Sequence, residues 1–427
     1  MILKLGKRPF FTFLICAWIV LPCLLPPLGE RGGTVTVSDI LGGLTILYCG
    51  LLATRIRMRL DVSDVALVVY LTIVVSSCLF YFGDRDTALL FARSIRLVLI
   101  FSPAFIFIFV RLELDSIRSM LRLYIVAATV GILLPLIAYA MGLQSAMANQ
   151  TIDLDATGVI NRAGGWVGDS SAFGHEISCL ALILVLGLLS GVFEFRLLYL
   201  GSFAVVLYGL YATSSRTALV TIFCATGLFL LLGPAKITSK LRSISLLVLI
   251  CGFATLGIFL AYSLGYLKGL GNVVDKLLTP FELIFNASRA AEVSSGRLEN
   301  WGALFDRVGW RVLYGTGFGT LPLRYGIEDN VVIKSLGETG LAGLLALVTV
   351  VGGAVYRFWR RRRIALAAMM LFFTLGQCVN AMFVDTTSFF SSMPVVVLFG
   401  FACYKHLRND GRERDSQLTE STAMVGH

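Results

Sequence analysis

Apolar runs long enough to cross a membrane constrain this chain more than any other feature of its sequence. A transmembrane helix needs about 20 predominantly apolar residues, and the 427-residue chain contains about twelve runs of this kind. In order they are Phe10–Leu28, Val37–Ala53, Val62–Phe82, Ala88–Val110, Leu121–Gly142, Phe173–Phe193, Leu197–Ala212, Thr217–Leu232, Ser245–Leu267, Leu336–Tyr356, Ile364–Phe383 and Phe389–Tyr404. The sequence therefore predicts an all-α, polytopic integral membrane protein with about twelve transmembrane helices.

The fourth run contains two charges. Arg93 and Arg96 lie inside Ala88–Val110, where an arginine exposed to lipid is costly. They indicate either that the helix starts later or that this part of it faces a polar cavity.

The composition excludes several classes of soluble protein. Hydrophobic residues make up 57% of the chain and charged residues 15%, whereas soluble domains are about 45–50% apolar and about 25% charged. A chain this apolar is not a nucleic-acid-binding protein, so basic cytoplasmic loops are the better explanation for its net charge of +10. All nine cysteines lie in apolar runs without CxxC or CxxH spacing, which gives little support to a metal site or a disulfide framework.

Basic residues in alternate loops predict the orientation of the helices. Lys and Arg occur within segments 4–8, 55–59, 111–122, 196, 236–242, 357–363 and 405–414. With an even number of spans all of these segments fall on one side, the cytoplasmic side, so both termini are predicted to be cytoplasmic. The first run resembles a signal peptide but lacks a small-x-small cleavage site before Pro26-Pro27, so we expect an uncleaved first span.

Two long polar segments then lie on the opposite side of the membrane. Residues 143–172 and 268–335 form these outer loops, and the second is predicted to be partly helical because Leu298, Trp301 and Leu304 share one helical face. Residues 1–408 form one membrane domain, and the polar tail 409–427 is predicted to be disordered.

Three outer arginines are candidate ligands for an anion. Arg216 lies in TSSRT between two apolar runs, and it either snorkels to the interface or binds phosphate oxygens through its planar fork. Ser215 either adds a hydroxyl donor or caps the helix that follows. Arg297 begins a predicted helix, whose positive dipole end favours a bound anion; the alternative is a solvated arginine beside Glu299.

Arg162, the third of these arginines, lies in NRAGGWVGDSSAFGHE just before the sixth run. Gly164-Gly165 permit a tight backbone approach there. Trp166 either stacks on a sugar ring or anchors the chain at the membrane interface, and the interfacial preference of tryptophan favours anchoring. His175, at the head of the run, is most simply structural, with a general base as the alternative.

A glycine-rich turn and a carboxylate precede the tenth run. Asp329 is either a helix N-cap, with Asn330 beside it, or a base that accepts a proton from a sugar hydroxyl, with Glu328 as an alternative base. Glu338 is costly inside a membrane helix, so we expect it to pair with arginine or backbone donors and to support the site. The segment Gly315–Gly319 lacks the Lys-Ser/Thr and the strand of a nucleotide phosphate loop and predicts a hinge or tight turn.

The motifs described above lie within residues 161–340, and their order along the chain resembles that in the O-antigen ligase/polymerase superfamily. This family comprises the integral-membrane glycan polymerases and ligases of bacterial envelopes. Asn161-Arg162-x-Gly-Gly-Trp resembles the family's Arg-x-x-Gly stretch, and Ser215-Arg216-Thr217 resembles its Ser-Arg motif. Gly296-Arg297…Trp301 with Tyr314-Gly-x-Gly-x-Gly is similar to its Gly-Arg…Trp…Gly-x-Gly block. Asp329-Asn330 stands where the ligases have His-Asn, which favours a Wzy-type repeat-unit polymerase.

The resemblance implies a metal-independent glycosyltransferase of the bacterial inner membrane, without a cofactor. Its donor would be an undecaprenyl-diphosphate-linked glycan at the periplasmic face, and its product O-antigen, capsule or exopolysaccharide. The implied catalytic residues are Arg216, Arg297 and Asp329, and the implied substrate-binding residues are Arg162, Ser215, Trp166, Asn330 and Glu338. Besides the bilayer, a chain-length regulator and a flippase are candidate partners.

Two alternatives remain. One is an O-antigen ligase that moves finished glycan to lipid A core or protein. The other is a transporter or flippase, which is less favoured because the candidate charges gather at one face without two matching halves.

Overall fold

Apolar helices make up most of the part of the chain that the structure describes. The computed structural model describes residues 3–4, 9–25, 36–55, 60–81, 86–142, 150–155, 158–165, 170–193, 197–234, 245, 306–322, 330–383 and 392–408. Its helices are α1 (Pro9–Leu24), α2 (Val37–Ala53), α3 (Val62–Ser76), η2 (Ser77–Tyr81), α4 (Thr87–Phe101), α5 (Pro103–Phe109), α6 (Leu114–Ala140), α7 (Ser170–Ser190), α8 (Leu197–Thr213), α9 (Arg216–Leu232), η5 (Gly309–Leu313), α14 (Val331–Arg360) and α15 (Ala365–Phe383). A final helix covers residues 393–408.

These helices confirm the coarse prediction of a helical membrane protein. Within the described residues, five helices are long and apolar enough to cross a membrane, or six if the bent pair α4 and α5 counts as one span. The shorter apolar helices α1, α2, α8 and α9 fall on predicted spans. The total of twelve stays a prediction, because Ser245–Leu267 lies, except for Ser245, outside the described residues.

The bend between α4 and α5 has a local cause. The two helices meet at 42°, and Pro103 begins the second of them. Proline lacks the N–H that an unbroken helix needs and disfavours the helical conformation in the residue before it. The fourth predicted span, Ala88–Val110, is therefore a broken helix.

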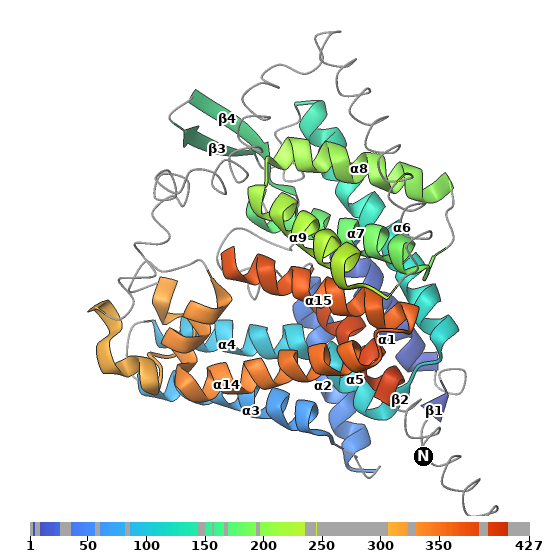
Figure 1. Cartoon of the computed structure of the whole chain (residues 1–427). Helices are drawn as coiled ribbons and strands as arrows, with labels where there is room; N and C mark the ends of the chain where they lie inside the picture. The colour runs from blue at the N-terminus through green and yellow to red at the C-terminus, as the bar shows by residue number, and fades with distance from the viewer. Residues whose placement is uncertain are drawn as a thin grey trace, which may run out of the picture.

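The helices pack as a bundle in which α7 is central and α14 is peripheral (Figure 1). The most apolar window of α7 is 89% buried, whereas that of α14 is 22% buried. Helices α14 and α3 lie side by side and antiparallel. Gly353 of α14 packs against Ser63 at the beginning of α3, and the backbone N–H of Phe318, which precedes α14, donates to Ser77 just after α3.

A buried charge cluster joins α3 to the final helix at one end of the bundle. Asp61 caps α3, with Asp64 at its third position. Lys405 contacts both carboxylates, and Arg408 pairs with Asp61. Burial by itself raises the pKa of Asp61, but the charges of Lys405 and Arg408 and its hydrogen bonds outweigh that effect, so the pKa lies below its usual value. Ser63 also donates to the Tyr404 hydroxyl, at 2.9 Å.

Two small sheets add to the helices. Strand β1 (Leu3–Lys4) pairs in parallel with β2 (Val110–Arg111). Strands β3 (Gln150–Asp155) and β4 (Gly158–Ala163) form an antiparallel hairpin in which Thr151 pairs with Arg162. We did not predict this hairpin within 143–172, although the alternation in TIDLD and the β-branched pair in GVIN are typical of short strands.

Candidate functional site

The turn between α8 and α9 fixes Ser215 and Arg216. Ser214 has a positive φ of 48°, and Ser215 is the N-cap of α9, with its side-chain oxygen accepting from the Ala218 N–H at 3.3 Å. Arg216 is the first residue of the helix. Of our two interpretations of Ser215, the helix cap is confirmed; a hydroxyl that accepts from a backbone N–H still carries a hydrogen to donate.

The beginning of α7 packs directly against this turn. A Cβ on Gly174 would overlap the Ser215 side chain, so glycine is needed for the close approach of the two helix ends. Gly165, with a φ of 59°, packs against Phe173 of α7 in the same way. Strand β4, which carries Arg162, contacts both α7 and α8. The backbone that bears Arg162, Ser215 and Arg216 is therefore gathered around the first turn of α7.

His175 forms a polar network inside this end of the bundle. It is 2% exposed, and its Nε2 lies 2.7 Å from Gln377 Oε1 while its Nδ1 lies 2.6 Å from Ser392 Oγ. Since an amide oxygen only accepts, the pattern assigns the hydrogen to Nε2 and lets Nδ1 accept from Ser392. Gln377 also donates to Cys179 Sγ at 3.3 Å. This network supports the structural interpretation of His175, because both ring nitrogens bind protein atoms.

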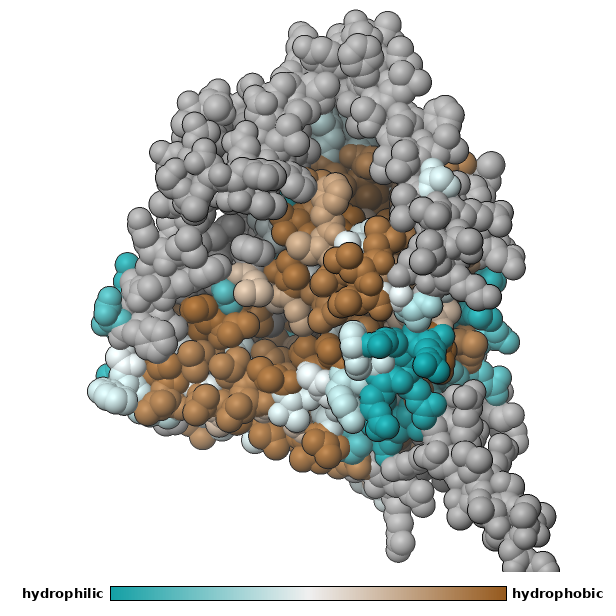
Figure 2. All heavy atoms as spheres, in the orientation of Figure 1, coloured by the Kyte–Doolittle hydropathy of each residue, from teal (hydrophilic) through white to brown (hydrophobic). Residues whose placement is uncertain are grey.

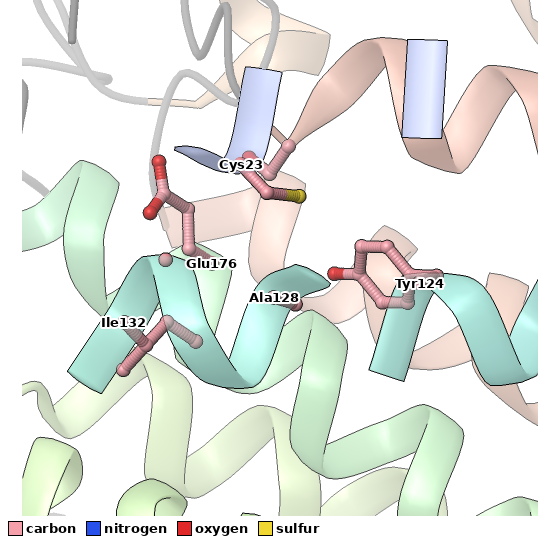
Figure 3. A pocket seen from close by; sticks show the side chains of 7 residues that line it. Cys23, Tyr124, Ala128, Ile132 and Glu176 are labelled. Carbon is pink, nitrogen blue, oxygen red and sulfur yellow. The ribbon is translucent and has the colours of Figure 1, made fainter. Parts of the chain in front are cut away.

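A small pocket lies beside the network, between α1, α6, α7 and the start of the final helix (Figure 3). It is lined by Cys23, Tyr124, Ala128, Gly131, Ile132, Glu176 and Ser392. Figure 3 shows the Tyr124 hydroxyl and the Cys23 sulfur directed toward the space beside Ala128. Polar groups at this depth of a helix bundle are costly unless they have partners or a function, and Glu176 is one of several groups here that have partners.

A glycine-rich bend clasps a break in α14. Gly340 has φ 71° and ψ −173°, so the helical path is interrupted there. The bend, residues 315–321, supplies N–H donors to the carbonyls exposed by the break: Thr316 to Gly337 at 2.8 Å and Gly317 to Glu338 at 2.9 Å. A Cβ on Gly315 would overlap the Glu338 carbonyl. The prediction of a tight turn at Gly315–Gly319 is confirmed.

Glu338 is held by this bend. Its side chain is 0% exposed, and its Oε1 accepts from the Leu321 backbone N–H at 3.2 Å. The expectation that Glu338 pairs with a backbone donor is confirmed. Its predicted contact with substrate stays a prediction, and the geometry favours an effect exerted through the bend.

Two further cations meet the bend. Arg93 of α4 donates from Nη1 to the Gly319 carbonyl at 3.3 Å, and Lys334 of α14, 8% exposed, lies 5.3 Å from the centre of the Phe318 ring. Arg96 pairs with Asp39 at 3.3 Å. Both arginines of the fourth apolar run thus have polar partners, whereas the polar cavity stays a prediction. The alternative of a later helix start was wrong, because α4 begins at Thr87.

The remaining predicted site residues are described only in part. The N-cap of α14 is Asn330, with its side chain accepting from Val332 at 2.8 Å and from Ile333 at 3.1 Å. The interpretation of Asp329 as the cap was therefore wrong by one residue, because the amide oxygen of Asn330 takes the free N–H groups of the first turn. Its φ of 86° is unusual for a residue other than glycine. Trp166, Arg297 and Asp329 lie outside the described residues, and of Arg162 only the backbone is described.

The contacts among the described residues thus arrange the candidates in two groups. The first is Ser215 and Arg216 with the start of α7, and the second is Asn330 and Glu338 with the bend, Arg93 and Lys334. Sequence reasoning missed Lys334, which precedes the tenth apolar run and gave no signal, and it missed the contact of Arg93 with the bend, for which a cation inside an apolar run was the available signal. Within the described residues, no three His, Cys, Asp or Glu side chains are grouped to hold a metal ion.

Comparison of the chain with known proteins gives no match, either to a protein-family model or to a curated protein.

Proposed function

We propose that the protein is a polymerase that joins undecaprenyl-diphosphate-linked oligosaccharide repeat units at the periplasmic face of the bacterial inner membrane. The observation that carries the proposal is the position of Arg216 in the first turn of α9, against the start of α7. A helix N-terminus offers backbone N–H groups to an anion, and an arginine there adds a bidentate fork for phosphate oxygens.

The orientation of the bundle supports this assignment. The five arginines of 357–363 lie in the last turn of α14 and just after it, at the end opposite its Asn330 cap. In Figure 2 hydrophilic side chains gather at that end of α14, beside a broad apolar surface. If the basic end is cytoplasmic, then the starts of α7, α9 and α14 are periplasmic. Lipid-linked repeat units would reach the candidate residues there.

The proposed reaction is an inverting glycosyl transfer. Arg216 and Arg297 hold the diphosphate of the donor, and a hydroxyl of the acceptor glycan attacks the anomeric carbon. The new glycosidic bond forms as the bond to the diphosphate breaks, undecaprenyl diphosphate leaves, and the hydroxyl proton passes to Asp329. Arginines placed on a departing phosphate stabilise the developing charge without reorganisation.

The other predicted residues have positioning roles in this proposal. Arg162 and Trp166 contact the glycan from the loop before α7, and Ser215 donates to the phosphate while it caps α9. Asn330 sets the start of α14 next to Asp329. Glu338 keeps the bend in register with α14 through Leu321, which supports an indirect role.

Arg216→Ala and Arg297→Ala test the proposal in cells that make the polymer. Each variant should leave single lipid-linked repeat units and no long chains. Unchanged polymer length in both variants would refute the assignment. A ligase would give a different result, because polymer would still form on the lipid carrier but would not reach lipid A core or protein.

A further inference from the structure

We propose that the last turn of α14 and the residues just after it bind the headgroup of an anionic phospholipid, whose acyl chains lie along the exposed apolar side of that helix. We call the five arginines Arg357, Arg360, Arg361, Arg362 and Arg363 the arginine turn. The site lies at the opposite end of α14 from Asn330 and does not depend on the glycan chemistry proposed above.

The exposed side of α14 has the length and composition for an acyl chain. After the break at Gly340, its large exposed residues are Leu341 at 46%, Leu345 at 56%, Val348 at 55%, Tyr356 at 62% and Trp359 at 42%. Their spacings of four, three, eight and three residues repeat close to whole helical turns, so they share one side of the helix. From Leu341 to Trp359 the helix rises about 27 Å, which approaches the roughly 30 Å thickness of the hydrocarbon core.

Aromatic residues mark the level of the headgroups. The five exposed residues from Leu341 to Trp359 form an apolar stripe, which ends with Tyr356 and Trp359. Tryptophan and tyrosine prefer the membrane–water interface. The arginine turn begins at the same level, within the last turn of α14. Figure 2 shows the same arrangement as an apolar surface that ends in a hydrophilic patch. A phosphate bound by these arginines would therefore be at the depth of a phospholipid headgroup.

Stacking prepares two of the arginines for phosphate. The guanidinium carbon of Arg362 lies 3.8 Å from the centre of the Trp359 ring, and that of Arg357 lies 4.1 Å from the centre of the Tyr404 ring. A stacked guanidinium keeps its N–H donors in its own plane, where they can form bidentate bonds to phosphate oxygens.

The charge of the arginine turn is not neutralised by the protein within the described residues. The nearby carboxylates Asp61 and Asp64 are taken by Lys405 and Arg408. No arginine of the turn forms an ion pair there; Arg360 and Arg363 are exposed, and the buried Nη1 of Arg357 and of Arg362 has no hydrogen-bond partner in that part of the chain. The positive-inside rule accounts for the number of arginines, but it requires neither the stacking nor the stripe.

Quenching of Trp359 fluorescence by brominated lipids tests the proposal. The full-length protein is reconstituted in phosphatidylcholine with rising fractions of dibrominated phosphatidylglycerol or dibrominated phosphatidylcholine. The difference in fluorescence between the wild type and Trp359→Phe gives the part of the signal that comes from Trp359. Brominated phosphatidylglycerol should quench that part at lower mole fraction than brominated phosphatidylcholine. Equal quenching by the two lipids in the wild type would overturn the proposal.

Variants localise the effect. The double variant Arg357→Gln/Arg362→Gln should lose preference for the anionic lipid by up to about thirtyfold, because each arginine near an anionic surface contributes a factor of about five. The control Arg55→Gln/Arg118→Gln removes the same number of arginines just after α2 and near the start of α6, and it should keep the preference. An equal loss in control and site variant would refute the site. If the site variant does not fold, the wild-type protein is measured in high salt instead. Its preference for the anionic lipid must then fall. A preference that does not change with salt would refute the proposal.

Discussion

Replacing Gly340 by alanine should disrupt the packing of the glycine-rich bend against α14. With φ 71° and ψ −173°, Gly340 occupies a backbone region that is essentially restricted to glycine and costs about 1–3 kcal/mol for other residues. A Cβ there would also lie 2.6 Å from Tyr314 C, 2.7 Å from Leu313 O and 2.8 Å from Gly315 N. Because all three are backbone atoms, a change of rotamer cannot relieve the overlap, and overpacking adds about 1–3 kcal/mol.

The two terms together give a destabilisation of about 2–6 kcal/mol, concentrated where Thr316 and Gly317 donate to α14. Hydrogen exchange of the purified protein measures it directly: the amides of Thr316 and Gly317 should exchange faster in Gly340→Ala. Gly352→Ala is the matched control on the same helix, because a Cβ at Gly352 meets nothing within 4 Å. If Gly340→Ala exchanged as slowly as this control, the argument from the break would be wrong.

Three further predictions concern buried charge. Glu338→Leu removes the acceptor for the bend and should lower stability by about 1–3 kcal/mol, whereas Glu338→Gln, which keeps the oxygen, should lower it less; thermal unfolding in detergent compares them. Lys405→Met leaves Asp61 and Asp64 without their shared partner and should cost about 3–5 kcal/mol, against about 0–1 kcal/mol for the exposed pair broken by Arg118→Met; equal losses would contradict the buried cluster. Because the folded-state pKa of Asp61 is lowered, its stabilisation is present above an unfolded pKa of about 3.9 and is lost as pH falls through the folded pKa; a variant Asp61→Asn should show a weaker loss of stability in acid.

The positions of the helices follow from the sequence because they depend on local properties. The run Val37–Ala53 coincides with α2, since apolar length defines the span and Thr36 with Asp39 forms a capping box that sets its start. Pro103 alone could have predicted the bend in the fourth span. We did not predict it, because we considered only Arg93 and Arg96 in that span.

The contacts within the candidate site could not be predicted in the same way. Glu338 pairs with Leu321, and Arg93 with Gly319, across 226 residues in the second case. No periodicity or spacing records such pairs. Gly340 lies in a run that favours an unbroken helix, and only the bend packed against it reveals the break.

Elongation by the purified protein tests the central claim most directly. Liposomes that contain the wild-type protein and undecaprenyl-diphosphate-linked repeat units should yield polymer. Arg216→Ala should be slower by about 100-fold or more, and Arg55→Ala, in a basic segment predicted to be cytoplasmic, should be unaffected. Elongation by Arg216→Ala at the wild-type rate, or movement of the glycan across the membrane without any elongation by the wild type, would contradict the account.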